Sequence, residues 1–427
     1  MKKNKHLPPP AQSVRAEGTR LADILGQDLV PRGINLIHKG NRLKDGTFNF
    51  YPDWPEDLYE RFAKLGMNLV RLGVLWAAIE PRPRQYDMRY LGFIQQQLDK
   101  AREAGLYVLL DMHQDLYAQR FSDGAPDWAV LTDAPFEETA LWSDAYLTSR
   151  AVQESWDAFW ENRLVHGTGA GLMDHFAATW AVLASRFGGH PALLGYDILN
   201  EPAPGSDIRQ MFGHILGNVY SLLSEDELAA LGIAGEGPEA VAGVFMNPEG
   251  KLALLDLLED PERYRQLGEM SREPVLQFEH HTLEPFYEKV AATIRAHDAQ
   301  GFLLRGNNYL SNIGIPSGIR AIRVNGKPDP RQIFAPHGYD LVVDTPAMQA
   351  PSNSRAASIF TRHRETQLQL NIPAIVTEWG AFAHYDSALT HGRFLLDLFE
   401  GWGWGHAYWC YTEDFFEVPA RDLFGTR

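Results

Sequence analysis

The sequence predicts an α/β protein in which eight βα units close into a single (β/α)8 TIM barrel. From Leu21 onward, short apolar runs alternate with longer amphipathic segments, which is the pattern of repeated βα units. Several amphipathic segments end at a glycine in a helix-capping position, as at Gly66 and Gly105. A chain of 427 residues can hold such a barrel with insertions, because these barrels use about 250 residues or more as one domain.

The elements follow in order along the chain. Strands are expected at 33–37, 68–73, 107–111, 193–199, 302–304, 332–335, 374–376 and 407–410. Helices are expected at 57–65, 90–104, 172–187, 283–297, 354–370 and 389–402. A small hairpin of Leu21–Ile24 and Leu29–Val30 is expected ahead of the barrel. Eight strands with intervening helices fit one closed parallel barrel better than an open sheet.

The chain divides into a short tail and one long domain. Residues 1–18 are polar and contain prolines, so we expect a flexible N-terminal tail, followed by a barrel domain over 19–427. Two long insertions follow the third and fourth strands, at about 114–171 and 203–280; the first is rich in aromatic residues and the second is acidic and helical in pattern. Because both follow strands, both should lie at the face of the barrel that carries active sites.

Composition excludes several classes of function. The 55 acidic and 39 basic residues leave a formal net charge of −16, so the basic surface expected of a nucleic-acid-binding protein is missing. No apolar stretch is long enough for a transmembrane segment, although transient contact with lipid surfaces stays open. The N-terminus begins like a signal peptide, but Pro8, Pro9 and Pro10 stand where its apolar run should be. We therefore expect a cytoplasmic protein.

Two glutamates end predicted strands. Glu201 follows the fourth strand and Glu378 follows the seventh, so both carboxylates should emerge at the C-terminal rim and face each other across the mouth. Retaining glycoside hydrolysis uses two carboxyl groups about 5–5.5 Å apart, of which one protonates the departing oxygen and the other attacks the anomeric carbon. The tripeptide Asn200-Glu201-Pro202 alone could be a loop start. The second strand-end glutamate favours catalysis.

Around these glutamates the chain resembles glycoside hydrolase family 5, and within it the endoglycoceramidase and glucosylceramidase-related branch. The family motifs are Asn-Leu-Val-Arg-Leu at 68–72, Leu-Asp-Met-His-Gln-Asp at 110–115, Leu-Asn-Glu-Pro at 199–202, Pro-His-Gly-Tyr at 336–339, Thr-Glu-Trp-Gly at 377–380 and Tyr-Trp at 408–409. Two further motifs point to the branch: Gly-Ala-Pro-Asp-Trp at 124–128 and Ile-Pro-Ser-Gly at 315–318.

The resemblance implies roles for the residues nearest the reaction. Glu201 would be the general acid/base and Glu378 the nucleophile. Arg71 would lie beneath Glu378 and help to keep it ionised, although it could instead pair with a buried acid to hold the barrel. Asn200 would bind the sugar 2-hydroxyl, and Tyr339 would donate a hydrogen bond to the nucleophile.

Further positions are implied to bind the sugar. His113 and Asp115 would contact the cleaved glycosyl residue, His337 would line the same pocket, and Trp409 would be the floor on which the sugar stacks. The two histidines could instead be core residues with satisfied hydrogen bonds, and Trp409 could be ordinary core. Lys39 resembles a sugar-contacting lysine of the branch.

Two further signals are interpreted as structural. Asp111 is assigned a structural role from strand alternation. His280-His281 with Glu284 lacks a metal-site pattern and is expected at a helix start.

The predicted activity is that of a retaining β-glycosidase acting on a glycolipid-like substrate, namely a glycosylceramide or a related amphiphilic β-glycoside. No metal or cofactor is expected, because the two carboxylates carry both chemical steps. The alternatives are an endo-β-glucanase or mannanase, a soluble β-glucosidase, and a catalytically silent carbohydrate-binding barrel. An open cleft with aromatic platforms on both sides of the glutamates would favour the polysaccharide, whereas a deep pocket leading to an apolar channel would favour the glycolipid.

Overall fold

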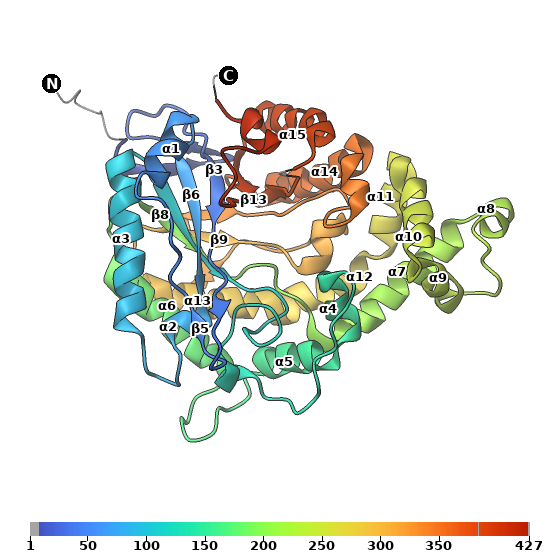
Figure 1. Cartoon of the computed structure of the whole chain (residues 1–427), viewed down its shortest axis with the longest axis horizontal. Coiled ribbons are helices and arrows are strands. Elements are labelled where there is room, and N and C mark those ends of the chain that lie inside the picture. The colour runs from blue at the N-terminus through green and yellow to red at the C-terminus, as the bar shows by residue number, and fades with distance from the viewer. Residues whose placement is uncertain (1–7, 383, 426–427) are drawn as a thin grey trace.

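Eight parallel strands close around a central axis in the computed structural model, which describes residues 8–382 and 384–425 (Figure 1). The strands are β3 (Arg32–Leu36), β6 (Leu69–Leu75), β7 (Tyr107–His113), β8 (Leu193–Asp197), β9 (Phe302–Arg305), β12 (Gln332–Phe334), β13 (Ile375–Gly380) and β14 (Gly405–Trp409). They pair in the order β12-β9-β8-β7-β6-β3-β14-β13. The backbone N–H of Phe334 donates to the carbonyl of Pro373 at 2.9 Å and joins the two end strands. The predicted (β/α)8 barrel is confirmed.

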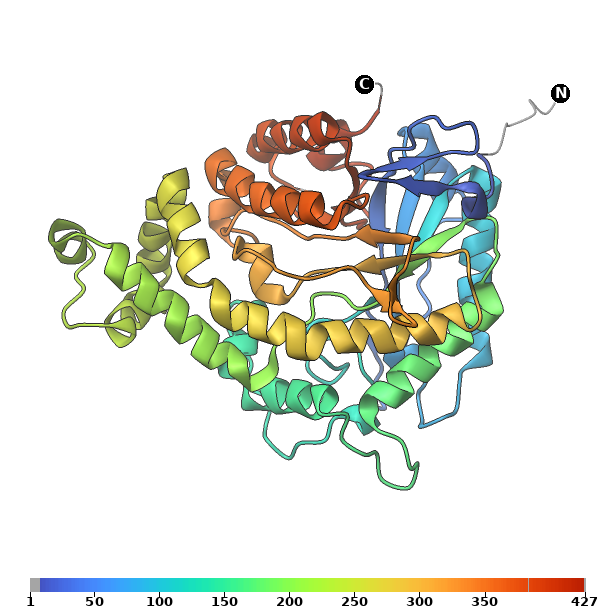
Figure 2. The ribbon, with the colours of Figure 1, turned by 180° about the vertical axis from the view of Figure 1, so that it is seen from behind.

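Helices cover the outside of the barrel, within a few residues of where the sequence predicts them. They are α1 (Leu58–Lys64), α3 (Met88–Ala104), α6 (Leu172–Phe187), α13 (Glu284–Arg295), α14 (Asn353–Leu370) and α15 (Leu389–Trp402). Helix α3 shows why the boundaries were predictable. The Asp87 side chain accepts hydrogen bonds from the N–H groups of Arg89 and Tyr90 at its start, and Gly105 ends it with φ at 81°. Figure 2 shows α6 and α13 next to each other on the outside of the barrel, on the side that faces the viewer.

The N-terminal segment corrects the prediction of a flexible tail over residues 1–18. Residues 1–7 lie outside the described part of the chain, but from residue 8 onward the segment is folded against the barrel. Ala11 and Val14 are buried, and the N–H of Ala11 donates to the carbonyl of Pro191 at 2.9 Å. Small apolar side chains among polar ones thus close the bottom of the barrel, where they pack against interior residues such as Leu109.

The predicted hairpin is also displaced. The observed hairpin pairs β1 (Arg15–Glu17) with β2 (Arg20–Ala22), so the chain turns at Gly18, which has φ of 59°. Residues 28–30 contribute only a single bridge, from Asp28 to Ala22. Other short elements are α2 (Trp76–Ile79) and the two-stranded pairs β4 (Asn41–Arg42) with β5 (Phe48–Asn49) and β10 (Arg323–Val324) with β11 (Lys327–Pro328).

The insertion after β7 packs as a cap of aromatic side chains on the barrel. It contains α4 (Ala145–Thr148) and α5 (Arg150–Trp160). Trp156 and Phe159 are buried, and the Trp160 ring lies 5.4 Å from that of Phe286 on α13. These aromatic residues therefore hold the insertion in place.

The insertion after β8 forms a group of helices that projects from one side of the barrel, at the right of Figure 1. The helices are α7 (Ile208–Leu222), α8 (Glu225–Ala230), α9 (Pro238–Phe245), α10 (Pro248–Asp256), α11 (Pro261–Met270) and α12 (Arg272–Phe278). We call residues 208–270 the helical lobe. His280 and His281 do not start a helix as predicted. They lie in a π-helical turn, Glu279–Leu283, that runs directly from α12 into α13.

The barrel interior is apolar toward the N-terminal ends of the strands and polar toward the C-terminal ends. The apolar part is a buried cluster that includes Leu69, Leu109, Phe302 and Ile375. The polar part begins at Arg71, two residues after Leu69 on the same face of β6. Among the described residues, no helix combines the length and the apolar character needed to cross a bilayer.

Candidate active site

The two predicted glutamates lie at the C-terminal end of the barrel. Glu378 belongs to β13, and Glu201 lies four residues after the end of β8 with a positive φ of 40°. A carboxylate oxygen from each lies within 4.8 Å of the other, with a ring nitrogen of His337 inside the same distance. This close approach favours the retaining arrangement over the wider separation of about 6.5–9.5 Å that inversion requires.

Glu378 is held by direct donors on both of its oxygens. Arg71 Nη1 donates to Oε1 at 2.6 Å, and the hydroxyl of Tyr339 donates to Oε2 at 2.9 Å. Burial raises the pKa of the Glu378 carboxyl, while His337 and Arg71 act to lower it. The guanidinium and the hydroxyl that donate to this carboxyl group oppose the effect of burial, because hydrogen bonds to the ionised form stabilise the carboxylate that a nucleophile needs.

Arg71 is buried and uses all five of its N–H donors. They go to the side-chain oxygens of Asn35, Glu378, Asp111, Asn200 and Asp197, at distances from 2.6 to 3.0 Å. Burial acts to lower the pKa of Arg71, but the three carboxylates more than offset it, so the pKa is raised. The arginine thus fixes several site residues at once. It also pairs with buried acids, so the two roles considered for it from the sequence coexist.

Glu201 has a different environment from Glu378. Its Oε1 accepts from Asn312 Nδ2 at 3.0 Å and lies 2.9 Å from His337 Nδ1. Burial, followed by the negative charge of Asp115, raises the pKa of Glu201 to about 7. A carboxyl group with this pKa holds a proton near neutral pH and can return one, which suits a general acid/base.

Asn200 is oriented by groups on both sides. Its side-chain oxygen accepts from Arg71 at 2.8 Å, and its Nδ2 donates to the carbonyl of Gln114 at 3.1 Å. An amide nitrogen has two N–H groups, so the second can be offered to a sugar hydroxyl. The predicted contact with the 2-hydroxyl therefore has a donor to make it.

The aromatic floor and its polar rim come from β14, β7 and the loop after β3. The half-buried Trp409 has the His113 ring parallel to it at 5.1 Å between centroids, and Lys39 Nζ lies 5.3 Å from its centroid. Burial acts to lower the pKa of His113, but Asp111 and other acidic groups raise it to about 10. Lys39 forms an ion pair with Asp115. The structure thus brings together the four residues predicted to contact the sugar at this side of the mouth, namely Lys39, His113, Asp115 and Trp409.

Asp111 corrects the sequence interpretation. It shares a strand face with His113, two residues further along β7, and both point into the barrel. Its two oxygens accept from Arg71 Nη2 at 2.8 Å and meet His113 Nδ1 at 2.8 Å. Asp111 therefore belongs to the site, where it orients the arginine and the histidine.

Five further residues of the site were not selected from the sequence, namely Asn35, Asp197, Gln114, Asn312 and Asp123. For Asn35 and Asp197 a signal existed, because each is a polar residue inside an apolar strand run and is buried in the structure. Asn312 lies in a short 3-10 helix, Tyr309–Ile313, 111 residues along the chain from its partner Glu201, and nothing in its local sequence marks it.

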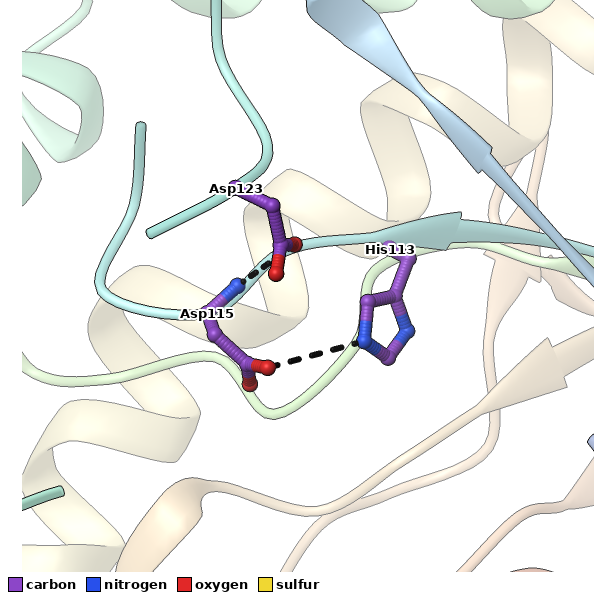
Figure 3. A group of neighbouring side chains, drawn as sticks. All are labelled: His113, Asp115 and Asp123. Atoms are coloured by element: carbon purple, nitrogen blue, oxygen red, sulfur yellow. Dashed lines mark hydrogen bonds and ion pairs between the residues drawn. The ribbon is translucent and has the colours of Figure 1, made fainter. Parts of the chain in front are cut away.

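Two groups of side chains in the described part of the chain have the composition of a metal site. One is Glu201, His337 and Glu378, whose atoms are engaged in the contacts given above. The other is His113, Asp115 and Asp123 (Figure 3). Lys39 Nζ pairs with both aspartates of the second group, so an ammonium already supplies the positive charge there.

Comparison with known proteins agrees with this geometry. The family described as Cellulase (glycosyl hydrolase family 5) matches residues 38–219 and 267–414, which is more than half of the chain. The chain belongs to glycosyl hydrolase family 5. The residues between the two matched segments, 220–266, fall in the helical lobe.

The individual proteins that this chain resembles include endoglycoceramidases. An endoglycoceramidase from Hydra vulgaris is 30% identical over 219 residues, covering 45% of this chain and 41% of that protein. Endoglycoceramidase I from Rhodococcus hoagii is 30% identical over 204 residues, covering 48% and 39%. The chain thus spans about two fifths of the length of these relatives. A lactosyl-enzyme intermediate of endo-glycoceramidase II from Rhodococcus sp. superposes with a TM-score of 0.63 at 23% identity, covering 92% of this chain and 75% of that one.

Proposed function

We propose that this family 5 barrel is a retaining β-glycosidase that cleaves the β-glycosidic bond of a glycosylceramide or a related amphiphilic β-glycoside. The observation that carries the chemistry is the close pair of carboxylates with unlike surroundings. One is held by Arg71 and Tyr339, and the other has its pKa raised to about 7. Two close carboxyl groups with different hydrogen-bond partners suit the separate roles of nucleophile and acid/base in retention.

In the first step, an oxygen of the Glu378 carboxylate attacks the anomeric carbon. The bond from that carbon to the aglycone oxygen breaks, and the proton of Glu201 passes to the departing oxygen. The product of this step is a glycosyl ester on Glu378 and a free alcohol. Arg71 and Tyr339 hold the nucleophile in place, while the free N–H of Asn200 faces the sugar.

In the second step, Glu201 is ionised and accepts a proton from a water molecule that enters where the alcohol has left. The water oxygen attacks the anomeric carbon and the ester bond to Glu378 breaks, which restores the carboxylate. Two inversions at one carbon give net retention. Asn312 and His337 hold the acid/base from the outer side through both steps.

An apolar cavity in the helical lobe supports an amphiphilic aglycone. It has a volume of about 100 Å³ and lies between the helical lobe and the barrel. Its lining is almost entirely apolar and includes Leu216, Val241, Phe245, Ile313 and Ile315. Ile313 directly follows Asn312, the donor to Glu201. The cavity lining therefore includes the chain neighbour of a residue that contacts the acid/base.

The relatives support the same substrate class, since two are named as endoglycoceramidases. Endo-glycoceramidase II from Rhodococcus sp. has been trapped as a lactosyl-enzyme intermediate, which is the kind of covalent species proposed here. The cytoplasmic location stays a prediction.

The test is to incubate the purified protein and a Glu378→Gln variant with glucosylceramide in mild detergent, p-nitrophenyl β-glucoside and β-1,4-glucan, and to measure released sugar. We expect the wild type to release glucose from glucosylceramide. The variant should be slower by roughly four to six orders of magnitude, as for loss of other enzymic nucleophiles. Ser354→Ala, on the outside of α14, is the matched control, because its exposed hydroxyl contacts only the backbone carbonyl of Glu259.

Each outcome has a distinct meaning. Release from glucan or the aryl glucoside alone would keep the mechanism and replace the glycolipid with a polysaccharide or a soluble glucoside. Binding of a β-glycoside without any cleavage would contradict the proposed activity and favour the silent carbohydrate-binding barrel.

A further inference from the structure

Asp123 lies beneath the polar rim of the sugar site and has no role in the two chemical steps. It is buried in the loop after β7, where its backbone pairs with that of Asp115. Its Oδ1 accepts from the N–H of Asp115 at 3.0 Å, and its Oδ2 lies 3.1 Å from Lys39 Nζ. One buried carboxylate therefore contacts both members of the neighbouring ion pair. Figure 3 shows the Asp123 carboxylate at the backbone N–H of Asp115.

The Lys39–Asp115 pair faces the place where the sugar should sit. Lys39 Nζ lies 5.3 Å from the centre of the Trp409 ring, and Asp115 Oδ2 lies 3.8 Å from His113 Nε2. The Lys39 side chain is 37% exposed, whereas that of Asp123 is fully buried. Lys39 can thus be reached by a ligand, but Asp123 is covered by the groups it holds.

A charged donor beside a charged acceptor is suited to a pair of adjacent hydroxyl groups. One hydroxyl accepts from the ammonium while its neighbour donates to the carboxylate, and hydrogen bonds to ionised groups are the stronger kind. Such a pair discriminates well only when both groups are fixed, because a flexible lysine would adapt to other hydroxyl patterns or turn to solvent.

We propose that Asp123 is a positioning residue that fixes Lys39 and Asp115 as a donor–acceptor pair for two neighbouring hydroxyls of the cleaved sugar. The inference rests on the proposed function for its ligand. The part of the inference that concerns the dependence of Lys39 on Asp123 does not require the proposed function. Burial acts to lower the pKa of Lys39, but Asp115 and Asp123 raise it above its ordinary value, so removal of one negative charge should be measurable at the lysine itself.

The first measurement follows Lys39 directly. Wild type, Asp123→Asn and the control Asp127→Asn are treated with a limiting amine-reactive acylating reagent, and the labelling rate of Lys39 is followed by peptide mass spectrometry. Asparagine retains an oxygen for the Asp115 N–H, and Asp127 is an exposed partner of Arg120 in the same loop. We expect Lys39 to be labelled about tenfold faster in Asp123→Asn, since a tenfold change corresponds to one pKa unit. The control should match the wild type.

The second measurement reads hydroxyl recognition through kcat/KM for p-nitrophenyl β-glucoside and its 3-, 4- and 6-deoxy analogues. In the wild type, removal of the hydroxyl at either of two neighbouring sugar positions should lower kcat/KM roughly 10- to 100-fold, as expected for hydrogen bonds to charged groups. In Asp123→Asn, kcat/KM for the parent glucoside should fall by a similar factor. The ratio of kcat/KM for the parent glucoside to that for each of the two deoxy analogues, which we call the deoxy penalty, should then approach one. A role limited to loop stability would slow every substrate by the same factor and leave the penalties intact.

The outcomes separate this inference from the proposed function. Unchanged labelling of Lys39 in Asp123→Asn overturns the inference, whether or not the protein cleaves any glycoside. Faster labelling with unchanged deoxy penalties also overturns it, because Lys39 would then be held for another purpose. If no glycoside is cleaved, the proposed function fails. The deoxy series is then repeated as binding of glucose and the deoxyglucoses by calorimetry, where absence of glucose binding overturns the inference as well. If Asp123→Asn does not fold, Lys39→Gln is expected to remove the same two penalties.

Discussion

At the mouth of the barrel, the five N–H donors of Arg71 all go to named side-chain oxygens, whereas the lining of the helical-lobe cavity is almost wholly apolar. The mouth is rigid because strand ends from β6, β7 and β13 supply its residues. The lobe consists of short helices, α7 to α11, that extend away from the sheet (Figure 1). Substitutions in the mouth should therefore harm every substrate, and substitutions in the lobe only those with a long apolar aglycone.

Among substitutions that leave the nucleophile in place, the largest effect on rate should come from Glu201→Gln, which removes the proton donor. For an alkyl β-glucoside, whose leaving group needs a proton, we expect kcat/KM to fall by roughly 10²- to 10⁴-fold. For dinitrophenyl β-glucoside, whose leaving group departs without a proton, the first step should be nearly unchanged in a pre-steady-state burst. Equal losses for both leaving groups would contradict the role assigned to Glu201.

Arg71→Met should damage both folding and catalysis. The substitution leaves Asp111, Asp197 and Glu378 buried without their shared cation. Breaking a buried pair in this way typically costs about 3–5 kcal/mol. Urea unfolding should show a loss of that size, and the surviving folded protein should be slow on all β-glucosides alike. A fully stable and active Arg71→Met variant would show that the mouth does not depend on this network.

The pH profile tests the difference between the two glutamates. The reaction needs Glu201 protonated in the first step, and its pKa is raised to about 7. The rate kcat/KM should therefore fall as the pH rises above about 7, by up to tenfold per unit. In Asn312→Ala, Glu201 Oε1 loses one of its hydrogen-bond donors, so the carboxylate is less stabilised and this limb should move to higher pH. A profile that is flat from pH 6 to pH 9 in the wild type would count against Glu201 as the acid.

The smallest and most selective effect should come from the lobe. Leu216→Asn places an amide in the apolar cavity and should lower kcat/KM for dodecyl β-glucoside roughly tenfold more than for p-nitrophenyl β-glucoside, given about 0.8 kcal/mol per buried methylene. The matched control is Leu252→Asn on α10, whose side chain is exposed. An equal loss for both substrates would show that the cavity is only a packing feature of the lobe.

The contrast between the barrel mouth and the helical lobe also explains what could be predicted from the sequence. The barrel strands are buried apolar runs, so their positions were visible, and strand-end residues such as Glu201 and Glu378 followed from them. Strand β13 was expected to stop at Val376 but continues to Gly380, because the chain resumes pairing with β14 after an irregularity between Val376 and Trp379. Local apolar content does not reveal such a continuation.

Contacts between distant segments were less accessible. Asn312 meets Glu201 across 111 residues, and Lys39 meets Asp115 across 76. The residues around Asn312 do not mark it, and those around Lys39 do not identify Asp115 as its partner. The helices of the lobe follow from their Leu and Ala patterns. Their packing around a cavity depends on turns and crossing angles that the pattern does not determine.

The most direct test of the central claim is to trap the covalent intermediate. The protein is incubated with 2,4-dinitrophenyl 2-deoxy-2-fluoro-β-glucoside, whose fluorine slows the second step more than its leaving group slows the first, and the labelled peptide is identified by mass spectrometry. A fluoroglucosyl ester on Glu378, formed with one equivalent of dinitrophenol, is the predicted result. A label on Glu201, or turnover that yields the α-anomer without any ester, would contradict the assignment of Glu378 as the nucleophile of a retaining enzyme.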